Sequence, residues 1–229
     1  MTEARRSPAA ILLDCLGTMV ALEPPAPLLV TELRQRLGIA VAEPRAERAI
    51  AAEIAYYRAH LDEGRDAGTL ADLHLRCAEV LREALPPSTE LSDAPGELLR
   101  EALLASLRFT PFGDARPALE LARARGQRLV VVSNWDVSLH DLLHRLALAP
   151  LLDGIVTSAE ARERKPSPRI FERALAVAGV RAGEAIHVGD SLGEDLRGAR
   201  AAGIEAVLIS RDGSPAPPGV RVVESLLAL

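Results

Sequence analysis

The sequence is poor in several residue types, and each scarcity narrows the class of protein. Of 27 basic residues only one is a lysine, Lys165, and the chain has a single asparagine, Asn134, and a single tryptophan, Trp135. Its two cysteines, Cys15 and Cys77, are too few and too far apart for a disulfide framework or a zinc site. A residue type that occurs only once in such a biased composition is there either by chance or because the residue that would replace it does not function at that position.

Long apolar runs and blocks of basic charge are also missing. No stretch approaches the roughly 18 apolar residues of a membrane span. The apolar run at 9–13, preceded by Arg5 and Arg6, is broken by Asp14 and is too short for an export signal. The formal net charge of −5 argues against a nucleic-acid partner. We therefore expect a soluble, cytoplasmic protein with no membrane and no nucleic-acid partner, and the sequence does not indicate its oligomeric state.

Short apolar segments carry the fold prediction. They lie at residues 9–13, 129–132, 154–156, 185–188 and 204–209. Runs of four to six apolar residues without strict alternation are typical of strands buried on both faces, and hence of a parallel sheet. Apolar stripes with helical spacing lie between the later runs, at 139–146 and 170–178. This alternation predicts an α/β fold with a doubly wound parallel sheet.

The stretch from 22 to 107 has a different character. It contains no good strand, and its apolar residues follow helical spacing at 50–61, 70–81 and 98–103. Prolines and glycines punctuate both of its ends. The sequence therefore predicts a discontinuous core domain, residues 1–21 and 108–229, with a helical domain of residues 22–107 inserted after the first strand.

Polar side chains follow the predicted strands where ligands bind in an open parallel sheet. Asp14 follows the first strand, Ser133 the second, Lys165 the third after a short loop, and Asp190 the fourth. Carboxylates are ligands for Mg²⁺, whereas a hydroxyl, an ammonium and backbone N–H groups hold phosphate oxygens. The combination suits phosphoryl transfer with an aspartate as covalent nucleophile.

Each of these residues also has a structural interpretation. Asp14 and Asp190 are possible turn formers at strand ends, and Asp136 is a possible helix N-cap. Ser191 with Glu194 fits a capping box, which favours a structural role for both. The convergence of four such groups at one sheet edge favours the chemical interpretation.

The order and spacing of these segments resemble the haloacid dehalogenase superfamily over nearly the whole chain. Residues 14–18 resemble its first motif, D-x-D-G-T after an apolar strand, and residues 129–133 its second, an apolar strand ending in Ser or Thr. Lys165-Pro166 resembles the third motif, and residues 189–195 the fourth, G-D-x-x-x-x-D. The insert at 22–107 resembles the helical cap of the C1 type.

The resemblance implies a role for each matched residue. The residues expected to be catalytic are Asp14 as nucleophile, Ser133 and Lys165. The residues expected to bind phosphate or substrate are Thr18, Ser133, Asn134 and Lys165. The residues expected to bind Mg²⁺ are Asp14, Leu16 through its backbone carbonyl, Asp190 and Asp195. The expected substrate is a small phosphorylated metabolite.

Leu16 departs from the family pattern. Phosphatases of the family carry a second aspartate there, which protonates the leaving group, and leucine neither donates nor accepts a proton. Loss of such help typically forfeits about 10²–10⁴ in rate. We expect a Mg²⁺-dependent, phosphatase-like hydrolase working through an aspartyl-phosphate on Asp14. The alternatives are a 2-haloacid dehalogenase, which needs no leaving-group proton but whose family members lack the metal ligand matched by Asp190, and a catalytically weak binding protein.

Other candidates carry weaker signals. His140 and His144 lie one helical turn apart without an evident third ligand, and His187 lies inside a strand as expected of a hydrogen-bonded core histidine. Cys15 is expected to pack, and Trp135 either lines the mouth of the site or packs. Aromatic and basic residues near the end of one insert helix are substrate selectors or a solvated face: Tyr56, Tyr57, Arg58 and His60.

Overall fold

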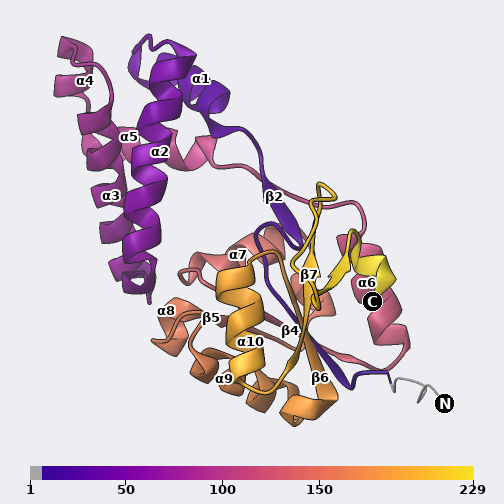
Figure 1. The fold of residues 1–229 in the computed structure, drawn as a ribbon. Coiled ribbons are helices and arrows are strands. Elements are labelled where there is room, and N and C mark those ends of the chain that lie inside the picture. The colour runs from indigo at the N-terminus through magenta and orange to yellow at the C-terminus, as the bar shows by residue number, and fades with distance from the viewer. Residues whose placement is uncertain (1–6) are drawn as a thin grey trace. The chain divides into compact units, whose positions relative to one another are not determined.

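The computed structural model describes residues 7–229, which divide into two compact units. The core unit contains the described residues up to Ala21 together with Pro111–Leu229, and the helical unit is Leu22–Thr110. Residues 108–110 thus fall in the helical unit, three residues past the predicted boundary. Figure 1 shows the chain coloured from its N-terminus to its C-terminus.

A six-stranded sheet forms the centre of the core unit, and every strand pair in it is parallel. The strands run in the order β5-β4-β1-β6-β7-β8. Their bounds are β1 (Ala10–Leu13), β4 (Arg128–Ser133), β5 (Gly154–Thr157), β6 (Ala185–Gly189), β7 (Glu205–Ile209) and β8 (Arg221–Val223). The predicted parallel α/β sheet is confirmed, and the short edge strand β8 was not predicted.

Burial on both faces explains why the sequences of these strands are continuous apolar runs. All four residues of β1 are buried. Leu12 belongs to the same apolar cluster as Phe171 of α9 (Pro168–Ala178). Leu13, on the opposite face, lines a small hollow with Leu119 of α6 (Ala115–Ala124). Successive side chains therefore enter two separate apolar layers, as in other sheets covered on both sides.

Short helices complete the core unit. They are α7 (Ser138–Arg145), α8 (Ser158–Ala161), α10 (Arg197–Ala201), the single turns η2 (Ala149–Leu151), η3 (Ala182–Glu184) and η5 (Leu226–Ala228), and a π-helical turn η4 (Leu192–Leu196). A two-stranded sheet of β2 (Val20–Leu22) and β3 (Phe109–Pro111) lies where the chain passes from one unit to the other and back.

The helical unit contains five α-helices and the single turn η1 (Leu61–Glu63). The helices are α1 (Pro25–Leu37), α2 (Glu43–His60), α3 (Ala67–Ala84), α4 (Thr89–Asp93) and α5 (Gly96–Ser106). The three predicted helical stripes correspond to α2, α3 and α5, whereas α1 and α4 were not predicted. Two of the prolines interpreted as punctuation lie in the first turn of α1, where a missing N–H costs no hydrogen bond.

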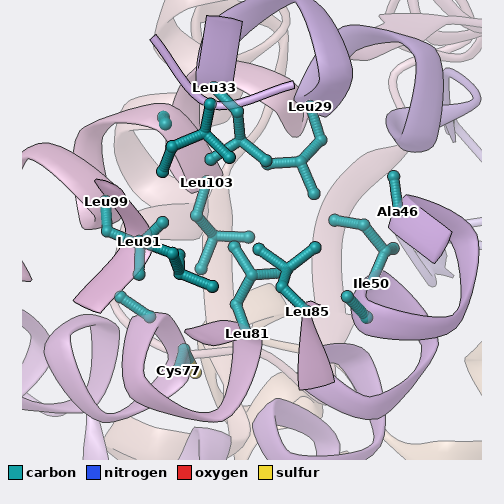
Figure 2. Packing of buried hydrophobic residues seen from close by; sticks show 14 of the residues in the cluster. Leu29, Leu33, Ala46, Ile50, Cys77, Leu81, Leu85, Leu91, Leu99 and Leu103 are labelled. Atoms are coloured by element: carbon teal, nitrogen blue, oxygen red, sulfur yellow. The ribbon is translucent and has the colours of Figure 1, made fainter. Parts of the chain in front are cut away.

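An apolar cluster fills the interior of the helical unit. Leu33 from α1, Ile50 from α2, Leu81 from α3 and Leu99 from α5 are all nearly inaccessible to solvent (Figure 2). Burying one leucine side chain contributes about 1.5–3 kcal/mol. Packing of this kind, rather than intrinsic propensity, accounts for most of the stability of such helices.

The most deeply buried acid of the helical unit lies on α2. Glu53 of α2 is only 3% exposed. Burial raises the pKa of Glu53 to about 7, although a hydrogen bond with Cys77 opposes the shift. A substantial share of its carboxyl groups is therefore still protonated at neutral pH.

None of the helices within residues 7–229 has the length and apolar character needed to cross a membrane.

Candidate active site

Three strand ends and one loop bring the predicted polar residues together in the core unit. Asp14 follows β1, Ser133 ends β4 and Asp190 follows β6. These side chains reach one edge of the sheet because β1 pairs in parallel with both β4 and β6. Lys165 comes from the loop between α8 and α9.

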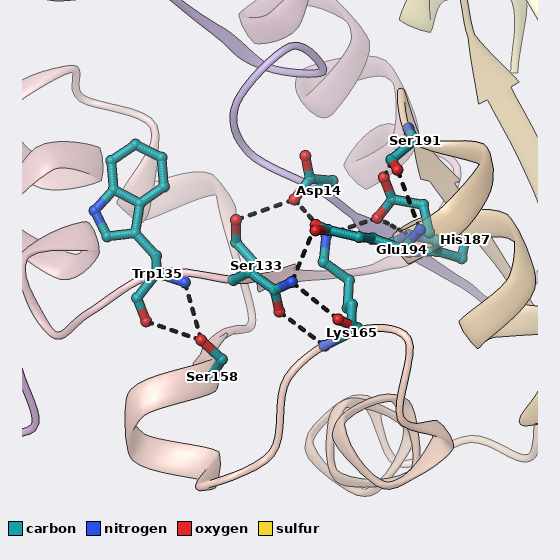
Figure 3. Close-up of polar contacts among 10 residues, drawn as sticks. Asp14, Ser133, Trp135, Ser158, Lys165, His187, Ser191 and Glu194 are labelled. Atoms are coloured by element: carbon teal, nitrogen blue, oxygen red, sulfur yellow. Dashed lines mark hydrogen bonds and ion pairs between the residues drawn. The ribbon is translucent and has the colours of Figure 1, made fainter. Parts of the chain in front are cut away.

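A buried lysine joins two of the carboxylates (Figure 3). Lys165 Nζ donates to Asp14 Oδ1 at 2.5 Å and to Asp195 Oδ1 at 2.6 Å. Ser133 Oγ also donates to Asp14 Oδ1, at 3.0 Å. All four side chains are almost inaccessible to solvent. Asp14 is thus held by a hydroxyl and an ammonium at once.

Lys165, Asp14 and Asp195 differ in how far their neighbours offset the effect of burial on their pKa values. Burial opposes the ammonium form, but the carboxylates of Asp14 and Asp195 outweigh it and raise the pKa of Lys165 above its usual range. Burial likewise opposes the Asp195 carboxylate, yet Lys165 and His187 hold the pKa of Asp195 well below its usual value. For Asp14 burial wins, and its pKa is raised. The lysine therefore remains charged, and Asp195 is its firmly ionised partner.

Donors surround both oxygens of Asp195. His187 Nε2 lies 2.9 Å from Oδ1, the oxygen that also accepts from Lys165, and the Ser191 backbone N–H donates to Oδ2 at 3.0 Å. His187 is fully buried, as expected of a hydrogen-bonded core histidine. These contacts suit Asp195 to orienting Lys165.

Asp14, Asp190 and Asp195 form an acidic cluster in which one ligand oxygen of each lies within 4.8 Å of the others. Asp190 is open to solvent, whereas the other two are buried. Partial burial and the charges of Asp14 and Asp195 raise the pKa of Asp190 to about 6. Three carboxylates face one ammonium, so the cluster carries excess negative charge. Oxygen donors with this charge fit a hard divalent cation such as Mg²⁺.

A tight turn after Asp14 makes room for this cluster. The Cys15 carbonyl accepts hydrogen bonds from the N–H groups of residues 18, 19 and 20. Gly17 has φ +78°, a left-handed conformation that favours glycine. A Cβ on Gly17 would lie 2.1 Å from Asp190 Oδ2. The glycine thus allows the backbone after Asp14 to approach the carboxylate of Asp190 from the neighbouring strand.

Two neighbours of Asp14 bear on the sequence predictions. The side chain of Leu16 is 42% exposed, so an apolar group reaches solvent two residues after Asp14. Thr18 is fully buried, and its hydroxyl has no hydrogen-bond partner among residues 7–229. Its predicted contact with phosphate thus lacks an accessible hydroxyl.

The side chain of Asn134 contacts the protein at three points. Its Oδ1 accepts from the Lys165 backbone N–H at 2.7 Å. Its Nδ2 donates to the Lys165 carbonyl at 3.1 Å and to Glu194 Oε2 at 3.0 Å. The amide predicted to bind substrate therefore pairs with the backbone of the only lysine, an arrangement that no sequence pattern indicates.

The weaker candidates in the core unit have structural partners. Trp135 is 7% exposed and its indole N–H donates to Ser138, which favours the packing interpretation. Asp136 accepts from the Ser138 N–H, but the N-cap residue of α7 is Val137, one position later than the sequence predicts. His140 pairs with Glu160, and with His144 it belongs to no group of three metal-ligating residues within 7–229. Burial raises the pKa of the Cys15 thiol well above its usual value, so it stays protonated.

Three of the four predicted selectors contact other residues of the helical unit. His60 stacks on Tyr56 at 4.1 Å, and the Tyr56 hydroxyl accepts from Arg76. Tyr57 packs against the apolar cluster. These contacts reduce the freedom of the side chains without showing what they bind.

The residues of this site belong to a segment that matches a known protein family. The haloacid dehalogenase-like hydrolase family matches residues 8–203, which include every site residue described above. This chain belongs to that family. Its core has the fold of that family.

Curated relatives are similar over part of their length. A haloacid dehalogenase-like hydrolase domain-containing protein 3 from Bos taurus is 40% identical over 47% of this chain and 42% of its own length. A phosphoserine phosphatase from Thermus thermophilus is 34% identical over 61% and 56%. A ribulose-1,5-bisphosphate 5-phosphatase from Halopiger xanaduensis is 34% identical over 63% and 62%. The chain thus spans about half the length of these relatives.

Solved structures are similar over nearly the whole chain. A phosphatase of the family from Thermococcus onnurineus is 27% identical, with a TM-score of 0.65 over 95% of this chain and 94% of that one. A defluorinating L-2-haloacid dehalogenase is 26% identical, with a TM-score of 0.73 over 97% and 93%. The phosphatase and the dehalogenase are about equally similar to this chain in structure. The fold alone therefore does not tell which of the two activities applies.

Proposed function

We propose that this protein is a Mg²⁺-dependent phosphatase that hydrolyses a small phosphorylated metabolite through a phosphoryl group carried on Asp14. The observation that carries the proposal is the buried contact of Asp14 with both Lys165 and Ser133 beside the carboxylate of Asp190. This arrangement supplies a nucleophile, a fixed positive charge and a hydroxyl at one point, which is what transfer of an anionic group needs.

The proposed reaction has two steps. A carboxylate oxygen of Asp14 forms a bond to phosphorus while the bond from phosphorus to the leaving oxygen breaks. Water then attacks the phosphorus of the acyl phosphate, which releases inorganic phosphate, restores the carboxylate and frees one proton that balances the leaving anion. Lys165 stabilises the charge that develops on the transferred group, and the Ser133 hydroxyl donates to it or to Asp14.

The residues that would hold Mg²⁺ are Asp14, the backbone carbonyl of Leu16 and Asp190, with Asp195 beside them. When bound, the ion would neutralise phosphate charge as a Lewis acid. Asp190 supports this assignment, since it is the solvent-open carboxylate of the cluster and Gly17 leaves room for it.

Leu16 leads us to propose a restricted range of leaving groups. A half-exposed leucine beside Asp14 supplies no proton to the departing oxygen. Phosphates whose leaving group departs readily as an anion, such as acyl phosphates, should therefore react faster than simple alkyl phosphates. The helical unit, inserted in the chain after β1, is proposed to select the substrate.

Dehalogenation is the second candidate, favoured by Leu16 and by the similar haloacid dehalogenase structure. In that reaction Asp14 would attack carbon, halide would leave without a proton, and water would hydrolyse the resulting ester. The phosphatase names among curated relatives and the presence of Asp190 weigh toward phosphate.

The deciding experiment is a screen of phosphoesters, acyl phosphates and 2-haloacids with and without Mg²⁺. We expect phosphate release that requires Mg²⁺ and is abolished by Asp14→Asn. Halide release without metal would establish the dehalogenase instead, and activity surviving Asp14→Asn would refute the nucleophile assignment. Release of neither product from any compound would favour a binding protein.

A second variant tests the role of residue 16. Leu16→Asp should raise the hydrolysis of alkyl phosphates by up to about 10²–10⁴-fold and acyl phosphates much less, because only the former need leaving-group protonation. Leu16→Asn, similar in size but without an acid, is the matched control. An equal gain with both variants would contradict the explanation, and no gain with Leu16→Asp would mean that another group already supplies the proton.

A further inference from the structure

We propose that Asn134 is a positioning residue that clamps the backbone of Lys165 and thereby fixes its ammonium between Asp14 and Asp195. The proposal rests on the proposed function for the catalytic meaning of Lys165. The clamp itself follows from geometry within the core unit.

The amide of Asn134 has its hydrogen-bonding capacity directed at the protein. An asparagine amide offers two N–H donors and one carbonyl oxygen. Nδ2 donates to the Lys165 carbonyl and to Glu194, and Oδ1 accepts from the Lys165 N–H. With both donors engaged, none is left to bind a substrate phosphate, so a positioning role fits the contacts better than a substrate contact.

Pairing at both the N–H and the C=O of one residue fixes its backbone on two sides. The side chain of lysine is long and flexible, so the location of its ammonium depends on where the chain starts and on what holds its end. At the far end Nζ is held by Asp14 and Asp195, at 2.5 and 2.6 Å. Asn134 fixes the near end, and the four carbons between are buried.

The third contact of Asn134 ties the clamp to the partner of the lysine. Glu194 lies in η4, directly before Asp195. Asn134 itself directly follows Ser133, the other group on Asp14. One amide therefore connects three segments that carry Ser133, Lys165 and Asp195, as Figure 3 shows for the contacts around Lys165.

The scarcity of lysine makes the clamp directly measurable. Protein labelled with ¹⁵N only in lysine has one lysine backbone amide signal, that of Lys165, because the chain contains one lysine. We expect Asn134→Ala to speed the hydrogen exchange of that amide by about five- to tenfold, since its acceptor is lost. The two Hε protons of Lys165, inequivalent in a fixed side chain, should move toward equivalence.

The kinetic arm separates positioning from substrate binding. Asn134→Ala should lower kcat by about 10²-fold with KM largely unchanged, because a displacement of about 1 Å at a reacting group costs that much. A loss confined to KM would overturn the proposal in favour of substrate binding. Unchanged exchange, or faster exchange with unchanged kcat, would also overturn it.

A paired substitution distinguishes the clamp from general structural support. Asn134→Asp keeps the acceptor but sets a carboxylate against Glu194 and the Lys165 carbonyl, so kcat should fall. Adding Glu194→Gln restores a donor toward residue 134 and should recover part of the lost kcat. A double variant whose kcat is no higher than that of Asn134→Asp would contradict the contact between Asn134 and Glu194.

Gln127→Ala is the matched control. Gln127 is another buried amide of the core unit that donates to a backbone carbonyl, that of Pro8, at 2.9 Å. Its loss should leave kcat and Lys165 exchange unchanged. If the wild-type protein hydrolyses nothing in the screen, the proposed function fails, while the exchange and Hε measurements still decide whether Asn134 holds Lys165.

Discussion

The pKa values of two buried carboxyl groups in this protein are shifted in opposite directions. Asp195 in the core unit and Glu53 in the helical unit are 1% and 3% exposed. Burial penalises the charge of both, yet the pKa of Asp195 is held well below its usual value and that of Glu53 is raised to about 7. Burial alone therefore does not decide whether an acid is ionised.

The difference lies in the donors that each carboxyl meets. Asp195 accepts hydrogen bonds from Lys165, His187 and the Ser191 backbone. Glu53 has a hydrogen bond with Cys77, which itself belongs to the apolar cluster of the helical unit. Charged and N–H donors stabilise the anion at the sheet edge enough to outweigh burial, whereas a weak thiol donor stabilises the Glu53 anion too little to do so.

Removing the lysine should have the largest effect on stability. Lys165→Met leaves two buried carboxylates without their cation and should lower the free energy of unfolding of the core unit by about 3–5 kcal/mol. Urea unfolding followed by the fluorescence of Trp135, the only tryptophan, measures this change. Arg169→Met, at an exposed ion pair on the next helix, is the control. An equal loss of unfolding free energy in the two variants would mean that burial of the ion pairs of Lys165 adds nothing to stability.

A core leucine of the helical unit should have the next largest effect. Leu81→Ala removes a fully buried side chain from the apolar cluster and should cost about 2–5 kcal/mol, because the cavity closes only in part. Urea unfolding followed by far-ultraviolet circular dichroism, to which the helices of both units contribute, measures this loss. Leu98→Ala, at a position 36% exposed, should change little. A comparable loss at both positions would contradict the packing shown in Figure 2.

The buried acid of the helical unit should produce a smaller, pH-dependent effect. Raising the pKa of Glu53 from 4.5 to about 7 means that the unfolded chain ionises first as the pH rises. Stability from this group is thus full below about pH 4.5 and falls until about pH 7, by about 3 kcal/mol at most. Glu53→Gln should remove that fall, so it should stabilise the protein at pH 8 and not at pH 4.

The control for this comparison is Glu47→Gln, an exposed glutamate on the same helix. It should leave the dependence of unfolding free energy on pH as it is in the wild type. A pH profile of Glu53→Gln identical to that of the wild type would show that Glu53 ionises normally, and the contrast with Asp195 would then disappear.

Sequence patterns were most informative where one physical rule applies along the chain. The runs at 129–132 and 185–188 predicted β4 and β6 because a strand buried on both faces must be apolar throughout. The short edge strand β8 has only partly buried and exposed residues and gives no such signal. Helix α1 was missed because prolines were interpreted as breaks, although they are tolerated in its first turn.

The sequence by itself determined the parallel sheet and the meeting of Asp14, Ser133, Lys165 and Asp190, because the carboxyl ends of parallel strands share one edge. Only the tertiary structure decided what each polar atom contacts. It turned Asn134 toward the backbone of Lys165, closed Thr18 off from solvent and surrounded Asp195 with donors. The pairings of Lys165 with Asn134 and Asp195 join residues 31 and 30 positions apart. They depend on distances and angles that spacing along the chain does not encode.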